Sequence, residues 1–258
     1  MPVADLGRIS LAYADIGTGD PPLLLIHELG GSGKSFRALT AHLAGRRRLL
    51  APDLRGAGES EKPPGAFTLE DTAEDLVLLL DQLGVARVDV LGTALGSFIA
   101  AALARRHPRR VRRLVLCAVA PDIAPNAAAY LTERANLVRT HGMRAAVNAS
   151  LDNSFPDAHA AIRAAYRPYW LANDPAAYAE LSLALALHSP TPAAWAALTQ
   201  PALVLSGAGD FLWPPPAGRA TAELIPAARF GVLEQAGHFP HLQDPAALAS
   251  AALDFLAG

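Results

Sequence analysis

The sequence has 258 residues, of which 52% are hydrophobic and 18% charged, and its formal net charge is -2. This composition can bury a large core within one α/β domain, and the near balance of charges offers no basic surface for nucleic acid. No apolar stretch approaches the roughly 18 residues of a membrane span, and acidic and basic residues interrupt the first 15 positions, unlike a signal peptide. We therefore expect a cytoplasmic protein without a membrane partner.

Short apolar runs alternate with amphipathic stretches along most of the chain, which predicts a mostly parallel central sheet flanked by helices. We expect strands at 23–26, 49–51, 88–91, 111–117, 202–205 and 230–233. Helices are expected from the glycine-rich turn after the first strand to about residue 42, and at 68–83, 94–106 and 248–256. Thr68 can cap its helix, because Asp71 lies three residues later in the capping-box position.

The strand pattern disappears between about Pro121 and Pro201, where the sequence is helical and interrupted by prolines. Two of the three tryptophans lie in this segment. We interpret it as a helical cap inserted over the carboxyl ends of the strands. Residues 1–120 and 202–258 would then form the core, and residues 121–201 the cap.

The segment Gly92-Thr93-Ala94-Leu95-Gly96 lies between a predicted strand and a predicted helix. Its spacing is typical of a nucleophile elbow, a strained turn whose flanking glycines let the strand and the helix pass closely. Alanine occupies the central position here, and a methyl group cannot attack a carbonyl. Ser97 lies one helical turn further on and is expected to pack or to bond to backbone, without replacing the missing hydroxyl.

Four further segments occur in the order and separation typical of the α/β-hydrolase superfamily, which the chain resembles over nearly its whole length. They are His27–Ser32, similar to the oxyanion loop but with Glu28 for the usual glycine, Asp53–Ser60, Gly207–Asp210 with Pro214, and Ala236–His241 with Asp244 and Pro245. The resemblance implies an α/β-hydrolase fold. Within the superfamily, the chain looks like 3-oxoadipate enol-lactone hydrolases and aminoacrylate-hydrolase-like proteins.

This resemblance assigns expected roles to the site residues. His238 would be the general base, and Asp210 would orient its ring and stabilise the imidazolium. The backbone N–H groups of Leu29 and Leu95 would form the oxyanion hole. Glu28 is expected to turn toward Arg55 or another cation, because a carboxylate beside an oxyanion site would repel negative charge. Candidate substrate-binding side chains are Trp170, Tyr166, Phe211, Trp213 and His188.

The expected activity is hydrolysis of a small carboxylic ester or lactone, and three explanations of Ala94 remain open. Alanine can replace a natural serine, as in an engineered Ser-to-Ala variant. Alternatively, it is natural, and His238 with Asp210 serves as the base for water activation, elimination, decarboxylation or another cofactor-free reaction. In the third explanation, the site only binds a ligand.

The sequence implies no cofactor and no metal, since the histidines do not show a zinc-ligand spacing. Gly30–Ser35 imitates a phosphate-binding loop, but Glu28 stands where that pattern needs a glycine. The expected partner is a small-molecule substrate, and the protein would be a monomer or a homodimer.

Overall fold

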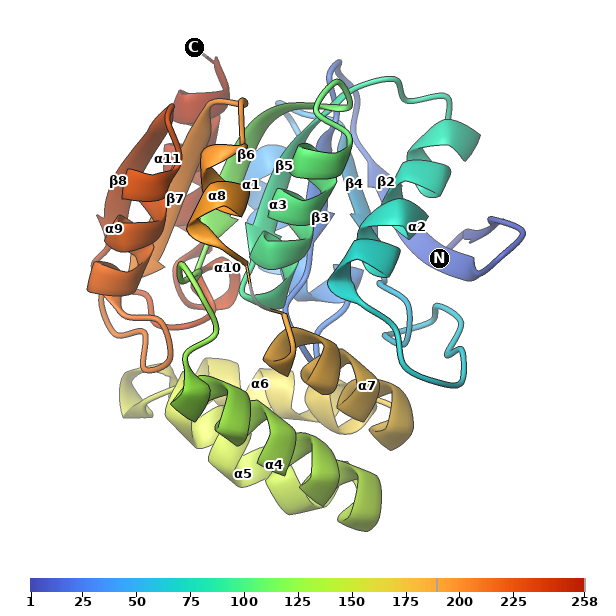
Figure 1. The fold of residues 1–258 in the computed structure, drawn as a ribbon, viewed down its shortest axis with the longest axis vertical. Coiled ribbons are helices and arrows are strands. Elements are labelled where there is room, and N and C mark those ends of the chain that lie inside the picture. The colour runs from blue at the N-terminus through green and yellow to red at the C-terminus, as the bar shows by residue number, and fades with distance from the viewer. Residues whose placement is uncertain (189, 258) are drawn as a thin grey trace.

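The computed structural model describes residues 1–188 and 190–257, in which a central sheet lies between two layers of helices (Figure 1). The sheet has eight strands in the order β1-β2-β4-β3-β5-β6-β7-β8. Their bounds are β1 Val3–Asp5, β2 Ser10–Ile16, β3 Leu23–Ile26, β4 Leu49–Pro52, β5 Val88–Thr93, β6 Val111–Cys117, β7 Ala202–Gly207 and β8 Ala228–Leu233. β1 and β2 pair antiparallel, as do β2 and β4, and the remaining pairs are parallel.

The central strands are mostly apolar because helices cover both faces of the sheet. Every residue of β3, β4, β5 and β7 is buried. The register aligns Ile26 of β3 with Gly92 of β5, and Thr93 of β5 with Cys117 of β6. Because the strands are parallel, the loops that follow β3, β5, β7 and β8 all emerge at one edge of the sheet.

Two helical layers cover the sheet, and each has its own apolar cluster. One contains α2 (Leu69–Gln82), α3 (Leu95–Arg106) and α9 (Pro215–Leu224), and the other contains α1 (Arg37–Leu43) and α11 (Pro245–Ala257). Helix α2 begins as predicted, since the Thr68 side chain accepts a hydrogen bond from the Asp71 N–H and Asp71 bonds back to the Thr68 N–H. The mostly parallel sheet flanked by helices is thereby confirmed.

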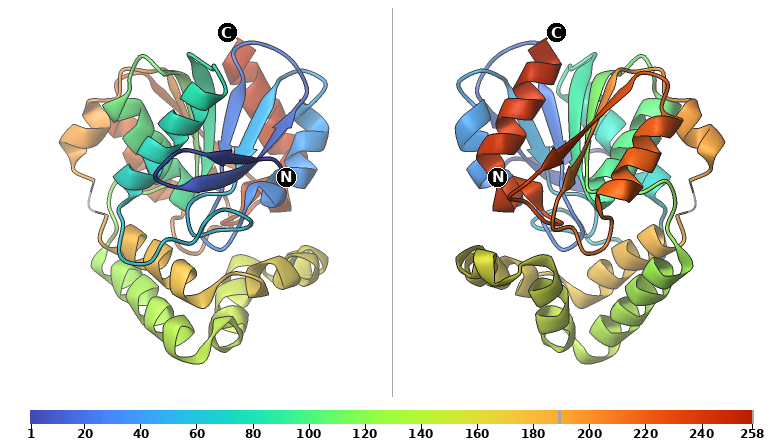
Figure 2. Two further views of the ribbon diagram at one scale, coloured as in Figure 1. Left: turned by 90° about the vertical axis from the view of Figure 1, so that its right-hand side faces the viewer. Right: turned by 90° about the vertical axis from the view of Figure 1, so that its left-hand side faces the viewer.

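Helices α4 (Pro125–His141), α5 (Met143–Ser154), α6 (Ala160–Leu171) and α7 (Pro175–Ala186) form a separate layer beyond the carboxyl ends of the parallel strands (Figures 1 and 2). Proline occupies the first turn of α4 and α7, where no intrahelical N–H bond is lost. Helix α8 (Pro192–Ala196) lies instead beside α9 along the sheet. The cap boundaries at residues 121 and 201 stay a prediction.

The sequence pattern did not predict β1 and β2. β1 has only three residues, and β2 combines buried, half-buried and exposed positions without strict alternation. Two short 3-10 helices, Gly33–Phe36 and Asp157–His159, and the four-residue helix α10 (Pro240–Gln243) were also not predicted. Within the described residues, no helix is long and apolar enough to cross a membrane.

Candidate active site

Ala94 occupies the tip of a strained turn between β5 and α3. Its backbone angles are φ 51° and ψ -117°, a conformation that side-chain-bearing residues rarely adopt. A Cβ on Gly96 would lie 2.0 Å from the Ile26 carbonyl oxygen, and one on Gly92 would lie 2.4 Å from the Gly96 oxygen. The two glycines are therefore required by close backbone packing, and the turn has the geometry of a nucleophile elbow without its nucleophile.

Ser97 is part of the scaffold of this turn. Its hydroxyl oxygen lies 2.7 Å from the Cys117 carbonyl oxygen and 2.8 Å from the Gly92 carbonyl oxygen, and it accepts a hydrogen bond from the Cys117 N–H at 3.0 Å. The side chain is fully buried. As predicted, it bonds to backbone and does not replace the missing nucleophile.

His238 and Asp210 come together from the loops after β8 and β7. The Nδ1 atom of His238 lies 2.9 and 3.0 Å from the two Asp210 carboxylate oxygens. The Oδ1 atom of Asp210 also accepts hydrogen bonds from the N–H groups of Leu212 and Trp213, both at 2.9 Å. An ionised Asp210 assigns the proton of a neutral His238 to Nδ1, so that Nε2 carries the free lone pair of a general base.

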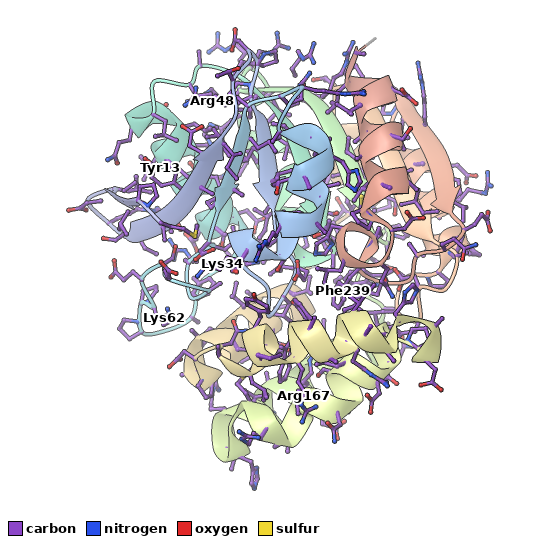
Figure 3. The ribbon with its side chains drawn as sticks, turned by 180° about the vertical axis from the view of Figure 1, so that it is seen from behind. Tyr13, Lys34, Arg48, Lys62, Arg167 and Phe239 are labelled. Atoms are coloured by element: carbon purple, nitrogen blue, oxygen red, sulfur yellow. The ribbon has the colours of Figure 1, made fainter. Side chains whose placement is uncertain are left out.

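A cavity of about 30 Å³ lies between Ala94 and His238 and is closed over by the cap. From the core it is lined by Leu29, Ala94, Leu95, Phe211, Leu212, Trp213, His238 and Phe239, and from the cap by Leu131, Arg134, Ser150, Leu151, Ser154, Trp170 and Leu185. Phe239 lies where the core and the cap meet (Figure 3). This volume accommodates about one water molecule, so an organic substrate requires the cap or the side chains of the cavity wall to move.

The two expected oxyanion donors border this cavity. Leu29 follows β3 and Leu95 is the first residue of α3. Neither backbone N–H donates a hydrogen bond to another group in the described parts of the chain. Both donors therefore remain available for a ligand oxygen. The Leu95 N–H also lies at the N-terminus of α3, where the helix dipole favours negative charge.

Arg134 is a cation at the cap end of the cavity that the sequence analysis did not single out. Its Nη1 atom lies 3.3 Å from the Tyr130 hydroxyl and 3.5 Å from the Ser150 hydroxyl, and its guanidinium covers the Tyr130 ring at 4.8 Å. Its Nε atom is buried without a partner, and no carboxylate of the described residues pairs with it. Only the packing of α4 against α5 and α7 brings Arg134 to the site.

Glu28 turns away from the cavity into a buried polar cluster, where it pairs with His241 and not with Arg55. One carboxylate oxygen accepts hydrogen bonds from Ser35 at 2.8 Å and Tyr166 at 2.5 Å, and the other lies 2.9 Å from Nε2 of His241. Burial favours the neutral acid, but the charge of His241 and the hydrogen bonds outweigh it and lower the pKa of Glu28 from 4.5 to about 2. Glu28 is thus a buried carboxylate that does not face the oxyanion donors.

Three of the five predicted substrate-binding side chains line the cavity, namely Trp170, Phe211 and Trp213. Tyr166 does not line this cavity, and its hydroxyl is bound to Glu28, so its contact with substrate stays a prediction. The same holds for His188. His188 lies in a separate cleft of about 490 Å³, where its ring packs edge-on against Phe98. Phe98 in turn packs edge-on against Trp213, which lines the cavity.

This elbow, the His–Asp pair and the two free N–H groups at the carboxyl edge of a parallel sheet define a hydrolase-type site. The chain belongs to the family described as alpha/beta hydrolase fold, which it matches over residues 21–245. The resemblance noted from the sequence is thereby confirmed.

Several relatives match nearly the whole chain. It is 34% identical to 2-hydroxymuconate semialdehyde hydrolase of Pseudomonas sp. (strain CF600), covering 94% of this chain and 89% of the relative. The enol-lactonase from Burkholderia xenovorans LB400 superposes with a TM-score of 0.92 at 30% identity, covering 100% of both chains. A thermophilic esterase from Thermogutta terrifontis, solved with malate bound, gives a TM-score of 0.90 at 31% identity, covering 96% of this chain and 93% of the esterase.

Proposed function

We propose that this protein hydrolyses a small ester or lactone that carries a carboxylate group. The observation that carries the proposal is Arg134, a cation without an acidic partner that lines the same closed cavity as His238. The comparisons support the reaction class, since the relatives include a protein called an enol-lactonase and another called an esterase.

Arg134 is half-buried and has no acidic partner among the described residues, and a substrate carboxylate would supply one. Arginine suits this task because its planar donors match the two oxygens of a carboxylate. The buried hydroxyls of Ser150 and Ser154 lie at the same cap wall and add polar groups there. The remaining wall is largely aliphatic and aromatic, which suits a compact, partly apolar substrate.

In the chain as it stands, a water molecule would act as the nucleophile above Ala94. His238 would remove a proton from this water as it attacks the carbonyl carbon, and Asp210 would stabilise the resulting imidazolium. The N–H groups of Leu29 and Leu95 would hold the oxyanion of the tetrahedral intermediate. As the intermediate collapses, the carbon–oxygen ester bond breaks, and the proton returns from His238 to the leaving oxygen.

Glu28 favours this serine-free route over a simple Ser-to-Ala replacement. The oxyanion loop also departs from the usual pattern at Glu28, and Ser35, Tyr166 and His241 are arranged around that carboxylate. A single engineered substitution at Ala94 would not produce this second departure. The two routes predict different effects of restoring a serine.

The test compares two chromogenic esters of similar size, p-nitrophenyl hydrogen succinate and p-nitrophenyl butyrate, of which only the first carries a carboxylate. Wild type should prefer the succinate ester, and Arg134→Met should lower its kcat/KM by about 10- to 100-fold while leaving the butyrate ester nearly unchanged. His238→Ala should abolish turnover of both. An unchanged preference in Arg134→Met, or persistent turnover in His238→Ala, would refute the proposal.

Ala94→Ser separates the two routes. If water is the nucleophile, wild type turns over the succinate ester and mass spectrometry finds no acyl-enzyme. If wild type is inactive and Ala94→Ser is active with an acyl-serine adduct, the hydrolase assignment stands and the water route is rejected. If neither protein turns over but both bind succinate, the site is a binding site and the proposed hydrolysis is refuted.

A further inference from the structure

Two links of polar side chains join the cap to the loop that carries His238, the first through a hydrogen bond and a close Glu28–His241 contact and the second through hydrogen bonds alone. In the first, the Tyr166 hydroxyl of α6 donates to Glu28 at 2.5 Å, and the second Glu28 oxygen lies 2.9 Å from His241. Glu28 directly precedes the oxyanion donor Leu29, and His241 lies three residues after His238. The first link therefore contacts both halves of the catalytic machinery from outside the cavity.

The second link is made by Gln243. Its side-chain nitrogen donates to the Ser154 carbonyl oxygen of α5 at 3.0 Å. Its side-chain oxygen accepts hydrogen bonds from Gly237 at 3.0 Å and Phe239 at 2.9 Å, the two N–H groups on either side of His238. One amide group thus holds the cap with its nitrogen and the His238 loop with its oxygen.

The cap must separate from the core before an organic substrate can enter, because the cavity of about 30 Å³ is walled by both parts. Separation of α6 would remove the Tyr166 hydroxyl from Glu28, which is fully buried. Separation of α5 would remove the Ser154 carbonyl oxygen from Gln243. The first separation removes a hydrogen bond from Glu28, the residue before Leu29. The second removes one from Gln243, whose oxygen binds the N–H groups on either side of His238.

We infer that Glu28 and Gln243 couple closure of the cap to the placement of His238 and Leu29, so that the site is fully assembled only when the cap is closed. Both are positioning residues, since neither lines the cavity. Glu28 suits this role because its carboxylate is fully buried, so loss of the Tyr166 hydroxyl would leave it with fewer donors and favour rearrangement of the groups around it. The inference rests on the proposed role of His238 as the base.

Tyr166→Phe tests the first link, since it removes one hydroxyl and keeps the ring that packs on Phe155 and Phe239. Tyr178→Phe is the matched control, because Tyr178 is a buried cap tyrosine whose hydroxyl has no hydrogen-bond partner among the described residues. Amide hydrogen exchange reports the opening of α6 and of the loop 236–243. Histidine-selective NMR reports the ring environment of His238.

Tyr166→Phe should raise exchange about tenfold or more in both α6 and the loop 236–243, and should shift the His238 ring resonances and their titration midpoint. The control should change neither. Faster exchange confined to α6, with an unchanged His238 ring, would show that Tyr166 only anchors the cap and would overturn the inference.

Gln243→Glu tests the second link independently. The replacement keeps a side-chain oxygen for the Gly237 and Phe239 N–H groups and removes the donor to Ser154. Exchange in α5 and the His238 ring signals should change together, and a change in α5 alone would count against the coupling. These readouts require no turnover, so a failure to hydrolyse either ester would refute the proposed function without deciding this inference.

Discussion

Replacing Glu28 with glutamine should destabilise the protein strongly at neutral pH, although Glu28 does not contact the cavity. Glutamine has nearly the same shape but no charge, so the carboxylate that lies 2.9 Å from His241 is lost while Ser35 and Tyr166 keep an oxygen acceptor. The pKa of Glu28 falls from 4.5 to about 2 on folding. By linkage this corresponds to about 3 kcal/mol of stabilisation of the ionised form, comparable to the cost of breaking a buried ion pair.

The pH dependence of this effect has a definite sign. Because the pKa of Glu28 is lower in the folded state, its stabilisation is fully present above about pH 4.5 and is lost as the pH falls toward 2. Wild type and Glu28→Gln should therefore differ by about 3 kcal/mol in the free energy of unfolding at pH 7, by less than half of that at pH 3, and should converge toward pH 2.

Urea unfolding followed by tryptophan fluorescence, measured at pH 7, 5, 4 and 3, checks this prediction. Glu59→Gln is the matched control, since Glu59 also forms an ion pair, with Lys34, but at the exposed surface, where solvent screens the interaction. If Glu28→Gln costs no more than Glu59→Gln, or if its cost is the same at pH 7 and pH 3, the ionised Glu28 carboxylate does not stabilise the folded state.

Three further predictions concern the elbow and the cap. Gly96→Ala should lower the free energy of unfolding in urea by at least about 2 kcal/mol, because its Cβ would overlap a backbone oxygen. Gly45→Ala, with open space around its Cβ, should lower it much less, and equal losses would contradict the packing argument. Ser97→Ala should cost about 1–3 kcal/mol by leaving the Cys117 N–H without its acceptor, and a neutral result would show that the turn does not need this bond. Succinate should raise the melting temperature of wild type but not of Arg134→Met, and an equal rise in both would place the anion elsewhere.

Much of the fold could be predicted because local chemistry and tertiary structure agree along the central strands. The run Leu114–Cys117 follows two half-buried arginines and lies inside the sheet, and all four of its residues are buried, so its apolar pattern directly reflects burial on both faces. The glycines of the elbow are required by distances between backbone atoms, and this requirement appears as a fixed spacing in the sequence. The strands β1 and β2 lacked such a signal, since β1 is a three-residue edge strand and β2 beside it is partly exposed, so both depend on pairing more than on composition.

The sequence by itself determined the order of the motifs, and with it that Ala94, His238 and Asp210 would meet, because parallel strands bring their carboxyl ends to one edge. It could not determine which cap residues face them. Arg134 reaches the cavity and Tyr166 does not, although both lie on cap helices, and the face each helix presents depends on packing between helices far apart in the sequence. The partner of Glu28 was also decided only by tertiary structure, since folding places its carboxylate 2.9 Å from Nε2 of His241, whereas Arg55 pairs with Asp75.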